Sequence, residues 1–175
     1  MMLTLWGERL GVFAGRPGWL DEPLLAETFS PDEVAQLTAA FAKATPEAIE
    51  RSRRTFEIVK SSVGKLNAAG VRFTVGTDAG GVSGGQFFGF ATHIEMQGMV
   101  AAGLAPAQVI VAATRNSAQM VGLDQLGSIA AGKSADFVVL DANPLDDIRN
   151  TRRIAQVYLR GQEVDRVRLK AKWGH

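Results

Sequence analysis

A short β-branched segment lies between two helical patterns, and this arrangement constrains the fold more than any other feature of the sequence. Val71-Arg72-Phe73-Thr74-Val75 has the residue types of a strand, and it runs into the glycine-rich segment Gly76–Gly81. Pro46–Leu66 before it carries one apolar stripe at helical spacing, and Phe87–Ala102 after it has the composition of a mostly buried helix. Helix, strand and helix in this order predict a parallel α/β unit.

Capping signals mark further helix boundaries. Ser30-Pro31-Asp32-Glu33 has the pattern of a capping box with proline at the first helical position, and apolar residues at helical spacing continue to Phe41. Pro106 begins another helix that extends to Ala118. Leu3–Leu25 is punctuated by glycine and proline, which predicts a long irregular loop.

Composition excludes several classes of protein. Nineteen basic residues against 18 acidic ones give a net charge of +1, so we expect neither nucleic acid nor an anionic membrane as a partner. The sequence shows no signal peptide and no apolar run of spanning length, which predicts a cytoplasmic location. Because cysteine is absent and only His93 and His175 are present, a thiolate zinc site is excluded and a histidine-rich one is limited.

The sequence pattern changes from helical to β-type after Gly127. Short β-type runs at Asp136–Leu140, Ile154–Leu159 and Val164–Leu169 are separated by turn signals. These runs predict a β appendage that follows an α/β body. The predicted division is residues 1–122 for the body and 123–175 for the appendage.

One segment in the appendage matches the phosphate-loop pattern. Gly127–Ser134 fits it letter for letter, but a phosphate loop must leave a strand and enter a helix whose N-terminus faces the phosphates. Here Leu123–Leu126 is a poor strand, and Lys133-Ser134 leads into an apolar strand pattern. The segment is therefore interpreted as a structural turn, with nucleotide binding kept as the last alternative.

Asp78 is the strongest candidate for a catalytic or metal-binding residue. It follows the predicted strand within Gly76-Thr77-Asp78-Ala79-Gly80, the position that catalytic residues occupy in β/α barrels. A carboxylate there can bind a divalent metal or take a proton from metal-bound water. Equally, an aspartate in a turn can bond to its own backbone, so both interpretations stay open.

Five motifs in register resemble the C-terminal part of the metal-dependent amidohydrolase superfamily, in its imidazolonepropionase-like and prolidase-like branch. They are Gly76–Gly80, His93-Ile94-Glu95, Gly103–Pro106 with Ala112–Ala118, Gly127-Ser128-Ile129 with Gly132–Asp141, and Asn143–Ile148. The resemblance covers about Thr55 to Glu163. It implies an α/β fold: the last strands and helices of a (β/α)8 TIM-type barrel, followed by strands of the flanking β-sandwich.

The resemblance also implies roles for single residues. Asp78 matches the aspartate after the eighth barrel strand, which binds the metal and acts as general base. Gly80 and Gly81 would lie in the loop beside the substrate. His93, on the next helix, would brace that loop or face the substrate, and the alternative is a histidine packed in the helix layer. Asp136 matches a structural position, and Thr4 would lie near the seventh strand.

Most of the family's metal ligands have no counterpart in this sequence. A zinc centre takes three protein ligands and a water, which Asp78 and His93 cannot supply, and a complete barrel takes about 250 residues. We therefore expect a C-terminal part of an enzyme that hydrolyses a C–N bond in a small amide, cyclic amide or dipeptide-like substrate. The complete enzyme would use zinc or another divalent metal. This chain alone would be inactive and would bind its missing barrel half or itself, and a non-catalytic assembly module is the alternative.

Overall fold

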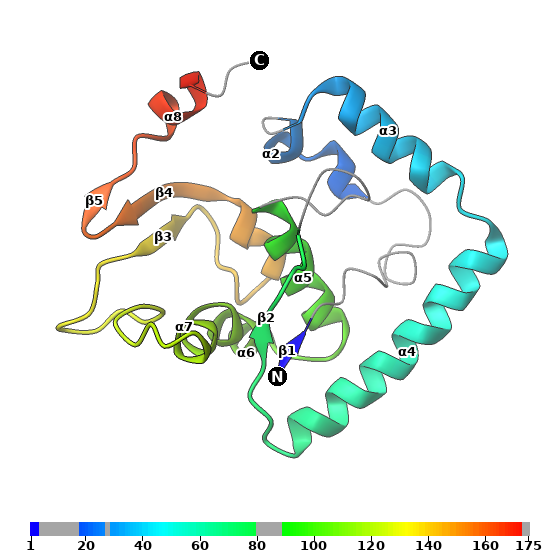
Figure 1. The fold of residues 1–175 in the computed structure, drawn as a ribbon, viewed down its shortest axis with the longest axis horizontal. Coiled ribbons are helices and arrows are strands. Elements are labelled where there is room, and N and C mark those ends of the chain that lie inside the picture. The colour runs from blue at the N-terminus through cyan, green and yellow to red at the C-terminus, as the bar shows by residue number, and fades with distance from the viewer. Residues whose placement is uncertain (4–17, 27–28, 80–88, 173–175) are drawn as a thin grey trace.

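The computed structural model of the chain describes residues 1–3, 18–26, 29–79 and 89–172. Helix α5 (Phe90–Ala101) lies at the centre of the fold. Helices α3 (Pro31–Ala42) and α4 (Pro46–Ala68) extend from it to one side, and the sheet of the C-terminal part lies on the other (Figure 1). The described residues thus form the α/β arrangement that the sequence predicts.

Strands β1 (Met2–Leu3) and β2 (Thr74–Val75) pair in parallel. The amide of Thr74 donates to the Met1 carbonyl at 2.9 Å and that of Gly76 donates to the Leu3 carbonyl at 2.9 Å. The predicted parallel unit is confirmed, although only the last two residues of the predicted strand 71–75 pair. Within the described part of the chain these strands do not form a closed barrel.

The prediction of an irregular segment from Leu3 to Leu25 is wrong at both of its ends. Leu3 belongs to β1 and is 4% exposed, because it pairs with a strand some seventy residues later in the chain. Gly18–Asp21 forms a 3₁₀ turn, η2, and Pro23–Ala26 forms the one-turn helix α2. These elements depend on tertiary contacts, which the number of glycines and prolines in a segment does not predict.

The capping signals are confirmed at the two long helices. At α3 the Ser30 hydroxyl accepts from the Glu33 amide at 3.3 Å, and the Ser30 amide donates to the Glu33 carboxylate at 2.8 Å. At α4 the Thr45 hydroxyl accepts from the Ala48 amide at 3.2 Å. Gly70 follows α4 with a φ of 76°, the left-handed conformation that ends a helix.

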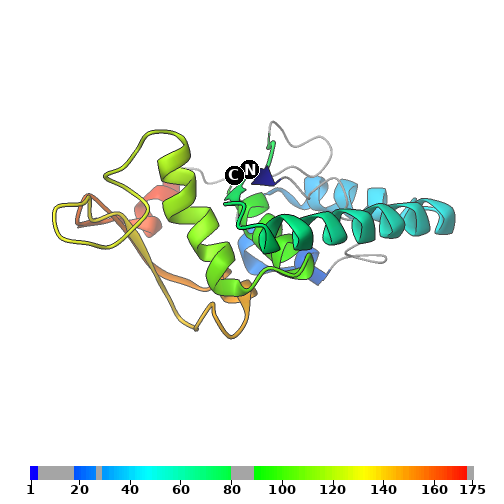
Figure 2. The same cartoon turned by 90° about the horizontal axis from the view of Figure 1, so that it is seen from below.

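The helix predicted from Pro106 to Ala118 is present but is not regular. It consists of α6 (Pro106–Val111), the π-turn η3 (Ala112–Asn116) and α7 (Ser117–Met120). Figure 2 shows the three as one column between the body and the C-terminal sheet. A π-turn carries one extra residue in a helical turn, and such turns are frequent at functional sites.

The C-terminal part is an antiparallel sheet in the order β3 (Phe137–Leu140), β4 (Ile154–Leu159), β5 (Gln162–Glu163). The 3₁₀ helix η4 (Ile148–Arg152) lies between β3 and β4. Phe137 and Tyr158 face each other across these strands, with ring centroids 4.6 Å apart. The two predicted strands that begin this sheet are therefore confirmed.

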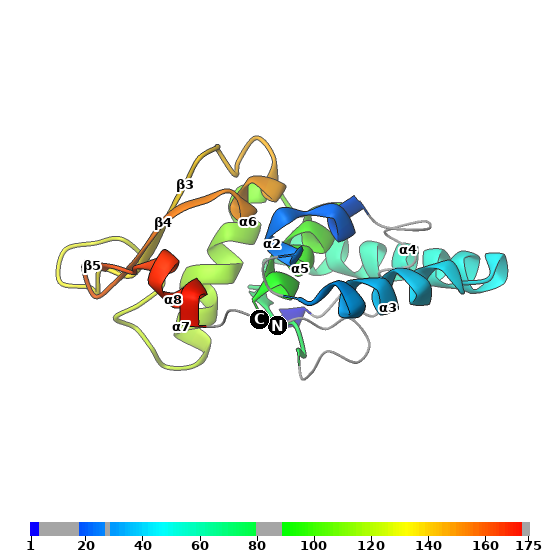
Figure 3. The same cartoon turned by 90° about the horizontal axis from the view of Figure 1, so that it is seen from above.

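The third predicted strand of the appendage, Val164–Leu169, is wrong. Helix α8 (Arg166–Lys172) occupies this segment, as Figure 3 shows. The Asp165 carboxylate accepts from the Arg168 amide at 2.9 Å, which satisfies one free amide of the first turn. This cap outweighs the weak β tendency of the two valines.

The described residues form two apolar clusters, and α5 contributes to both. The larger cluster joins β1, α4 and β2 to Met96 and Met99 of α5. The smaller one joins α3 and the N-terminal turns to Phe90 and Ile94 on the other part of α5. No described helix has the length and apolar composition needed to cross a membrane.

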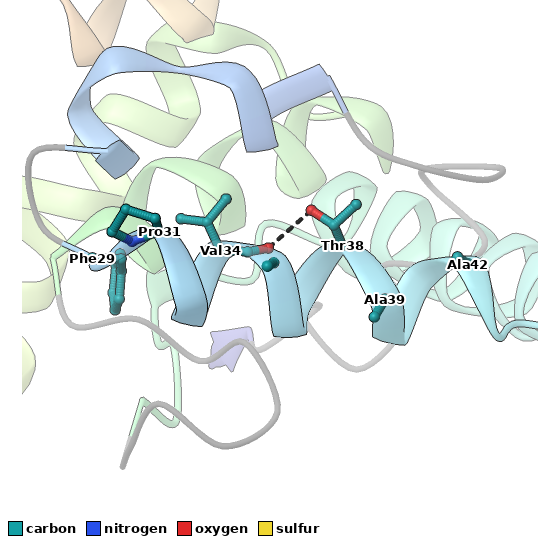
Figure 4. A pocket seen from close by; sticks show the side chains of 7 residues that line it. Phe29, Pro31, Val34, Thr38, Ala39 and Ala42 are labelled. Carbon is teal, nitrogen blue, oxygen red and sulfur yellow. Dashed lines mark hydrogen bonds between the residues drawn. The ribbon is translucent and has the colours of Figure 1, made fainter.

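Helix α3 carries an open apolar groove of about 640 Å³. Figure 4 shows Thr38 turned back onto its own helix, where its hydroxyl donates to the Val34 carbonyl at 2.9 Å, so it adds little polarity to the groove. The residues that line the groove are Phe29, Pro31, Val34, Ala35, Thr38, Ala39 and Ala42. Beyond α3, the side chain of Ile58 on α4 is also exposed, at 68%.

A pair of glycine substitutions tests how closely the appendage packs on the π-turn. Gly122 and Gly127 both have positive φ, 75° and 78°, but a Cβ at Gly122 meets open space. A Cβ at Gly127 would lie 2.7 Å from the Thr114 carbonyl oxygen, which is backbone and cannot move aside. We expect Gly122→Ala to lower the free energy of unfolding by about 1 kcal/mol from backbone strain.

Gly127→Ala adds the clash to that strain and should cost roughly 3 kcal/mol. Urea unfolding of the two variants measures the difference. Equal losses at the two positions would contradict the packing of Gly127 on the π-turn.

Candidate functional site

Asp78 lies at the end of the short parallel sheet, in the segment that follows β2. The segment from Gly76 to Ala79 leaves β2 directly, and the Ala79 amide donates to the Thr77 hydroxyl at 3.3 Å. Asp78 itself is exposed and has a φ of 49°. A non-glycine residue in this left-handed region costs on the order of 1 kcal/mol, and such strain is concentrated at functional sites.

The Asp78 carboxylate has no hydrogen-bond or ion-pair partner among the residues that the structure describes. Thr77, rather than Asp78, supplies the side-chain oxygen that bonds to the following turn. An aspartate that caps its own turn bonds to the amide two residues on, which here is residue 80 and lies outside the described residues. The carboxylate is thus presented outward at the end of β2, as a metal ligand or a general base requires.

His93 lies on α5 and is held by the C-terminal part of the chain. Its Nδ1 is 3.0 Å from the Thr151 hydroxyl, and that hydroxyl donates its only hydrogen to the Ile148 carbonyl at 2.8 Å. Since the hydroxyl hydrogen is used, Nδ1 must be the donor in the bond to Thr151. In the neutral ring, the network therefore places the proton on Nδ1 and the lone pair on Nε2.

Burial and a neighbouring cation keep this imidazole neutral. Two causes together lower the pKa of His93 to about 4. Burial is the larger cause, and the positive charge of Arg152 is the smaller one. Arg152 pairs with Glu22 and also donates to the Gln97 side chain. Its guanidinium lies 5.4 Å from the centre of the Phe90 ring, a cation–π contact.

The structure places Asp78 and His93 on consecutive elements but does not join them by a hydrogen bond. Among the described residues, His93 bonds to Thr151 of η4. This arrangement is what a histidine packed in the helix layer would show, and the substrate-facing role of His93 stays a prediction. Gly80, Gly81 and Thr4, the other predicted site positions, lie outside the described residues.

The described donors do not fit a complete metal centre. No three His, Asp or Glu residues among them gather at one point, and the Nδ1 of His93 is already bonded to Thr151. A catalytic zinc takes three protein ligands, and among the described residues Asp78 could supply one.

The phosphate-loop pattern does not have the geometry of a nucleotide site. Gly127–Ser134 follows helix α7 through turns and leads into β3, the reverse of the strand–loop–helix order. Asp136, just beyond it, accepts from the Arg160 amide at 2.6 Å, and this bond with one from Ser134 lowers the pKa of its carboxyl. Asp136 thus secures the turn between β4 and β5, consistent with a structural role.

Sequence reasoning missed Thr151, which bonds to His93, and Arg152, whose charge helps to lower the pKa of His93. Arg152 is 9% exposed, although a charged residue in a basic run is ordinarily placed on the surface. Its acidic partner, Glu22, lies 130 residues earlier in the chain. No local signal links the two, because the contact exists only after η4 docks on α5.

A model of the amidohydrolase family matches residues 23–164. The chain belongs to the amidohydrolase family. Enzymes of this family have a TIM-barrel fold, act on C–N bonds and in general depend on divalent metals. The family resemblance seen in the motifs is thereby confirmed, together with its imidazolonepropionase-like and prolidase-like relatives.

Similar proteins and structures match the chain over only part of their own length. The chain is 38% identical over 64 residues to an imidazolonepropionase from Deinococcus radiodurans, 35% of this chain and 16% of that protein. It is 39% identical over 67 residues to an adenine deaminase from Desulfitobacterium hafniense, 38% of this chain and 11% of that protein.

Among solved structures, a putative prolidase from Bifidobacterium longum is 32% identical, with a TM-score of 0.57. The match covers 91% of this chain and 40% of the prolidase. The described elements therefore correspond to less than half of an amidohydrolase.

The neutral, buried state of His93 predicts a specific loss of stability in acid. Its folded pKa of about 4 lies below its ordinary value of 6.5, so the unfolded chain binds the proton more readily. Stability that is present above pH 6.5 is therefore lost as the pH falls toward 4, by up to about 3 kcal/mol.

We expect His93→Gln to remove this component, so that the difference in unfolding free energy between variant and wild type changes between pH 7 and pH 4.5. Chemical denaturation at the two pH values measures it. Parallel pH profiles for the two proteins would show that His93 does not titrate in this way.

Proposed function

We propose that this chain supplies the Asp78 carboxylate and the closing strands of a metal-dependent amidohydrolase. The observation that carries the proposal is Asp78, which is exposed and has a strained backbone in the segment that follows β2. The chain that contains it belongs to the amidohydrolase family. The proposed reaction is hydrolysis of a C–N bond in a small amide, cyclic amide or dipeptide-like substrate. The related structures support that substrate range, since they include a putative prolidase and a phenylurea hydrolase.

Asp78 would handle the protons of this reaction. A water molecule attacks the carbonyl carbon, and the carboxylate accepts the proton that the water loses. The same group then donates that proton to the leaving nitrogen as the C–N bond breaks, so the carboxylate is regenerated. An exposed position at the end of a strand suits this exchange, because the carboxylate can reach a substrate without moving the sheet.

The remaining strands and metal ligands are proposed to come from polypeptide outside this sequence. The support is the coverage of solved relatives, 32% of an amidohydrolase and 40% of the putative prolidase. A two-stranded parallel sheet also has edges that further strands can extend. The partner would thus be the other part of a barrel, and a second copy of the chain is the alternative partner.

A transplant into a related enzyme tests the role of Asp78. We would replace the matching segment of the Bifidobacterium longum prolidase with this chain and measure turnover of that enzyme's substrate. Asp78→Asn in the chimera should lower kcat by about 10²-fold or more, as expected for loss of a general base. Asp146→Asn, at an exposed position of the appendage, is the control and should leave kcat unchanged.

The isolated chain completes the test. It should hold well under one equivalent of zinc by elemental analysis and should show no hydrolase activity. One tightly bound equivalent that is lost in Asp78→Asn would contradict the proposal that other polypeptide supplies the remaining ligands.

A non-catalytic assembly module is the second candidate. It is favoured by one observation, the lack of a clustered donor set among the described residues. The chimera separates the two candidates. A chimera that folds and turns over substrate equally well with Asp78 and with asparagine at that position would favour the module.

Exposed apolar surface predicts that the chain associates. The α3 groove and Ile58 leave apolar side chains uncovered by the described residues, and exposed apolar surface favours association. We expect light scattering at micromolar concentration to report a mass above that of the 18.7 kDa monomer. Ile58→Glu should lower this mass, whereas Ile129→Glu, at a still more exposed position in the appendage, should not. A monomeric wild-type chain would contradict the prediction.

A further inference from the structure

Strand β2 is bonded on two edges by two different kinds of partner. On one edge, Thr74 and Gly76 bond to β1. Alternate residues of a parallel strand bond toward opposite edges, so the carbonyl of Phe73 faces away from β1. That carbonyl accepts a hydrogen bond of 2.9 Å from the side-chain amide of Asn116, the last residue of the π-turn.

The π-turn sets which face of its helix meets β2. The Ser117 hydroxyl donates to the Ala112 carbonyl five residues back, at 2.7 Å, which marks the widened turn. One extra residue rotates everything after it by about 100° relative to a continuous α-helix. Without that rotation the side chain of Asn116 and those after it would point away from the strand.

Three contacts in a row follow from this rotation. Asn116, Gln119 and Met120 share one helix face, since they are three and four residues apart. Besides the Asn116 bond, Arg72 donates to the Gln119 side chain at 3.1 Å, and the Thr74 hydroxyl lies 3.5 Å from the sulfur of Met120. The helix therefore contacts three consecutive residues at and just before the start of β2, Arg72 to Thr74.

The π-turn is itself held in place from outside. Gly127 packs so closely on it that a Cβ there would lie 2.7 Å from the Thr114 carbonyl and 2.8 Å from the Cα of Arg115. The start of the appendage thus fixes the turn from which Asn116 reaches β2. A displaced turn would carry the Asn116 amide away from the Phe73 carbonyl.

We propose that Asn116 is a positioning residue for Asp78. A two-residue parallel strand is too short to hold its own position, and the Asn116 amide anchors it from the edge opposite β1. Because Asp78 follows Phe73 by only five residues, the anchor fixes the point from which the Asp78 segment leaves the sheet. The catalytic consequence rests on the proposed function of Asp78, whereas the anchoring itself does not.

Hydrogen exchange on the full chain tests the anchor. Asn116→Asp and Asn116→Leu both remove the amide donor, one with added charge and one without. In both variants we expect the amides of Thr74 and Gly76 to exchange about five- to tenfold faster, as the loss of one hydrogen bond predicts. Amides in the middle of α5, such as that of Met99, should keep their wild-type rates.

The matched control is Asn150→Asp. Asn150 also donates from its side chain to a backbone carbonyl, that of Asn143 at 2.8 Å, but within the appendage. It should leave exchange at Thr74 and Gly76 unchanged. The carbonyl carbon of Phe73 gives a second readout, because its NMR shift should move upfield in both Asn116 variants and not in the control.

A uniform rise in exchange over the whole chain, or unchanged rates at Thr74 and Gly76, would overturn the proposal and leave Asn116 with a general stabilising role. So would the same local rise in the Asn150 control. None of these readouts depends on turnover. Local exchange that rises as expected in a chain whose Asp78 proves inert would refute the proposed function and leave the anchoring intact.

Discussion

The burial of α5 on all sides is the constraint on which the rest of the structure depends. Seven of its 12 residues are buried, and it contributes to both apolar clusters. Through Met96 and Met99 it packs with the β1–β2 sheet and α4, and through Phe90 and Ile94 it packs with α3 and the N-terminal turns. Because most of this helix is buried, the neighbouring elements are arranged around it.

The same helix ties the appendage to the body through polar contacts. His93 bonds to Thr151, and Arg152 is buried between Glu22, Gln97 and the Phe90 ring. A buried guanidinium is costly unless it is paired, which makes this junction specific for one docking geometry. The π-turn provides a second link, since it contacts β2 through Asn116 and the start of the appendage through Gly127. The segment that presents Asp78 is therefore positioned by parts of the chain on both sides of it in sequence.

The helices were predictable where a local signal decides their ends. The capping box at Ser30 and the left-handed glycine after α4 act within a few residues, so a pattern in the sequence is sufficient. The strand predicted at residues 164–169 is instead helical. The cap from Asp165 outweighs the β-type composition of this segment. The π-turn at Ala112–Asn116 gave no periodicity signal, because one inserted residue shifts the apolar pattern without interrupting it.

The candidate site was likewise predictable only in part. The position of Asp78 after a strand followed from its local sequence and from the family resemblance. Its left-handed backbone and outward-facing carboxylate, and the engagement of His93 by Thr151, are visible only in the folded chain. The sequence left a packed and a substrate-facing His93 both open, since nothing near it in sequence reveals a partner 58 residues away.

The sequence by itself determined the family, the main helices and strands between Ser30 and Leu159, and the carboxylate that the site presents, because motifs, caps and composition act over short distances along the chain. Only the tertiary structure decided what holds that carboxylate in place. The bonds of β2 to β1 and to Asn116, and the burial of Arg152 against α5, join segments that lie far apart in the sequence. Such contacts depend on how whole elements pack, and packing is a property of the folded core as a unit.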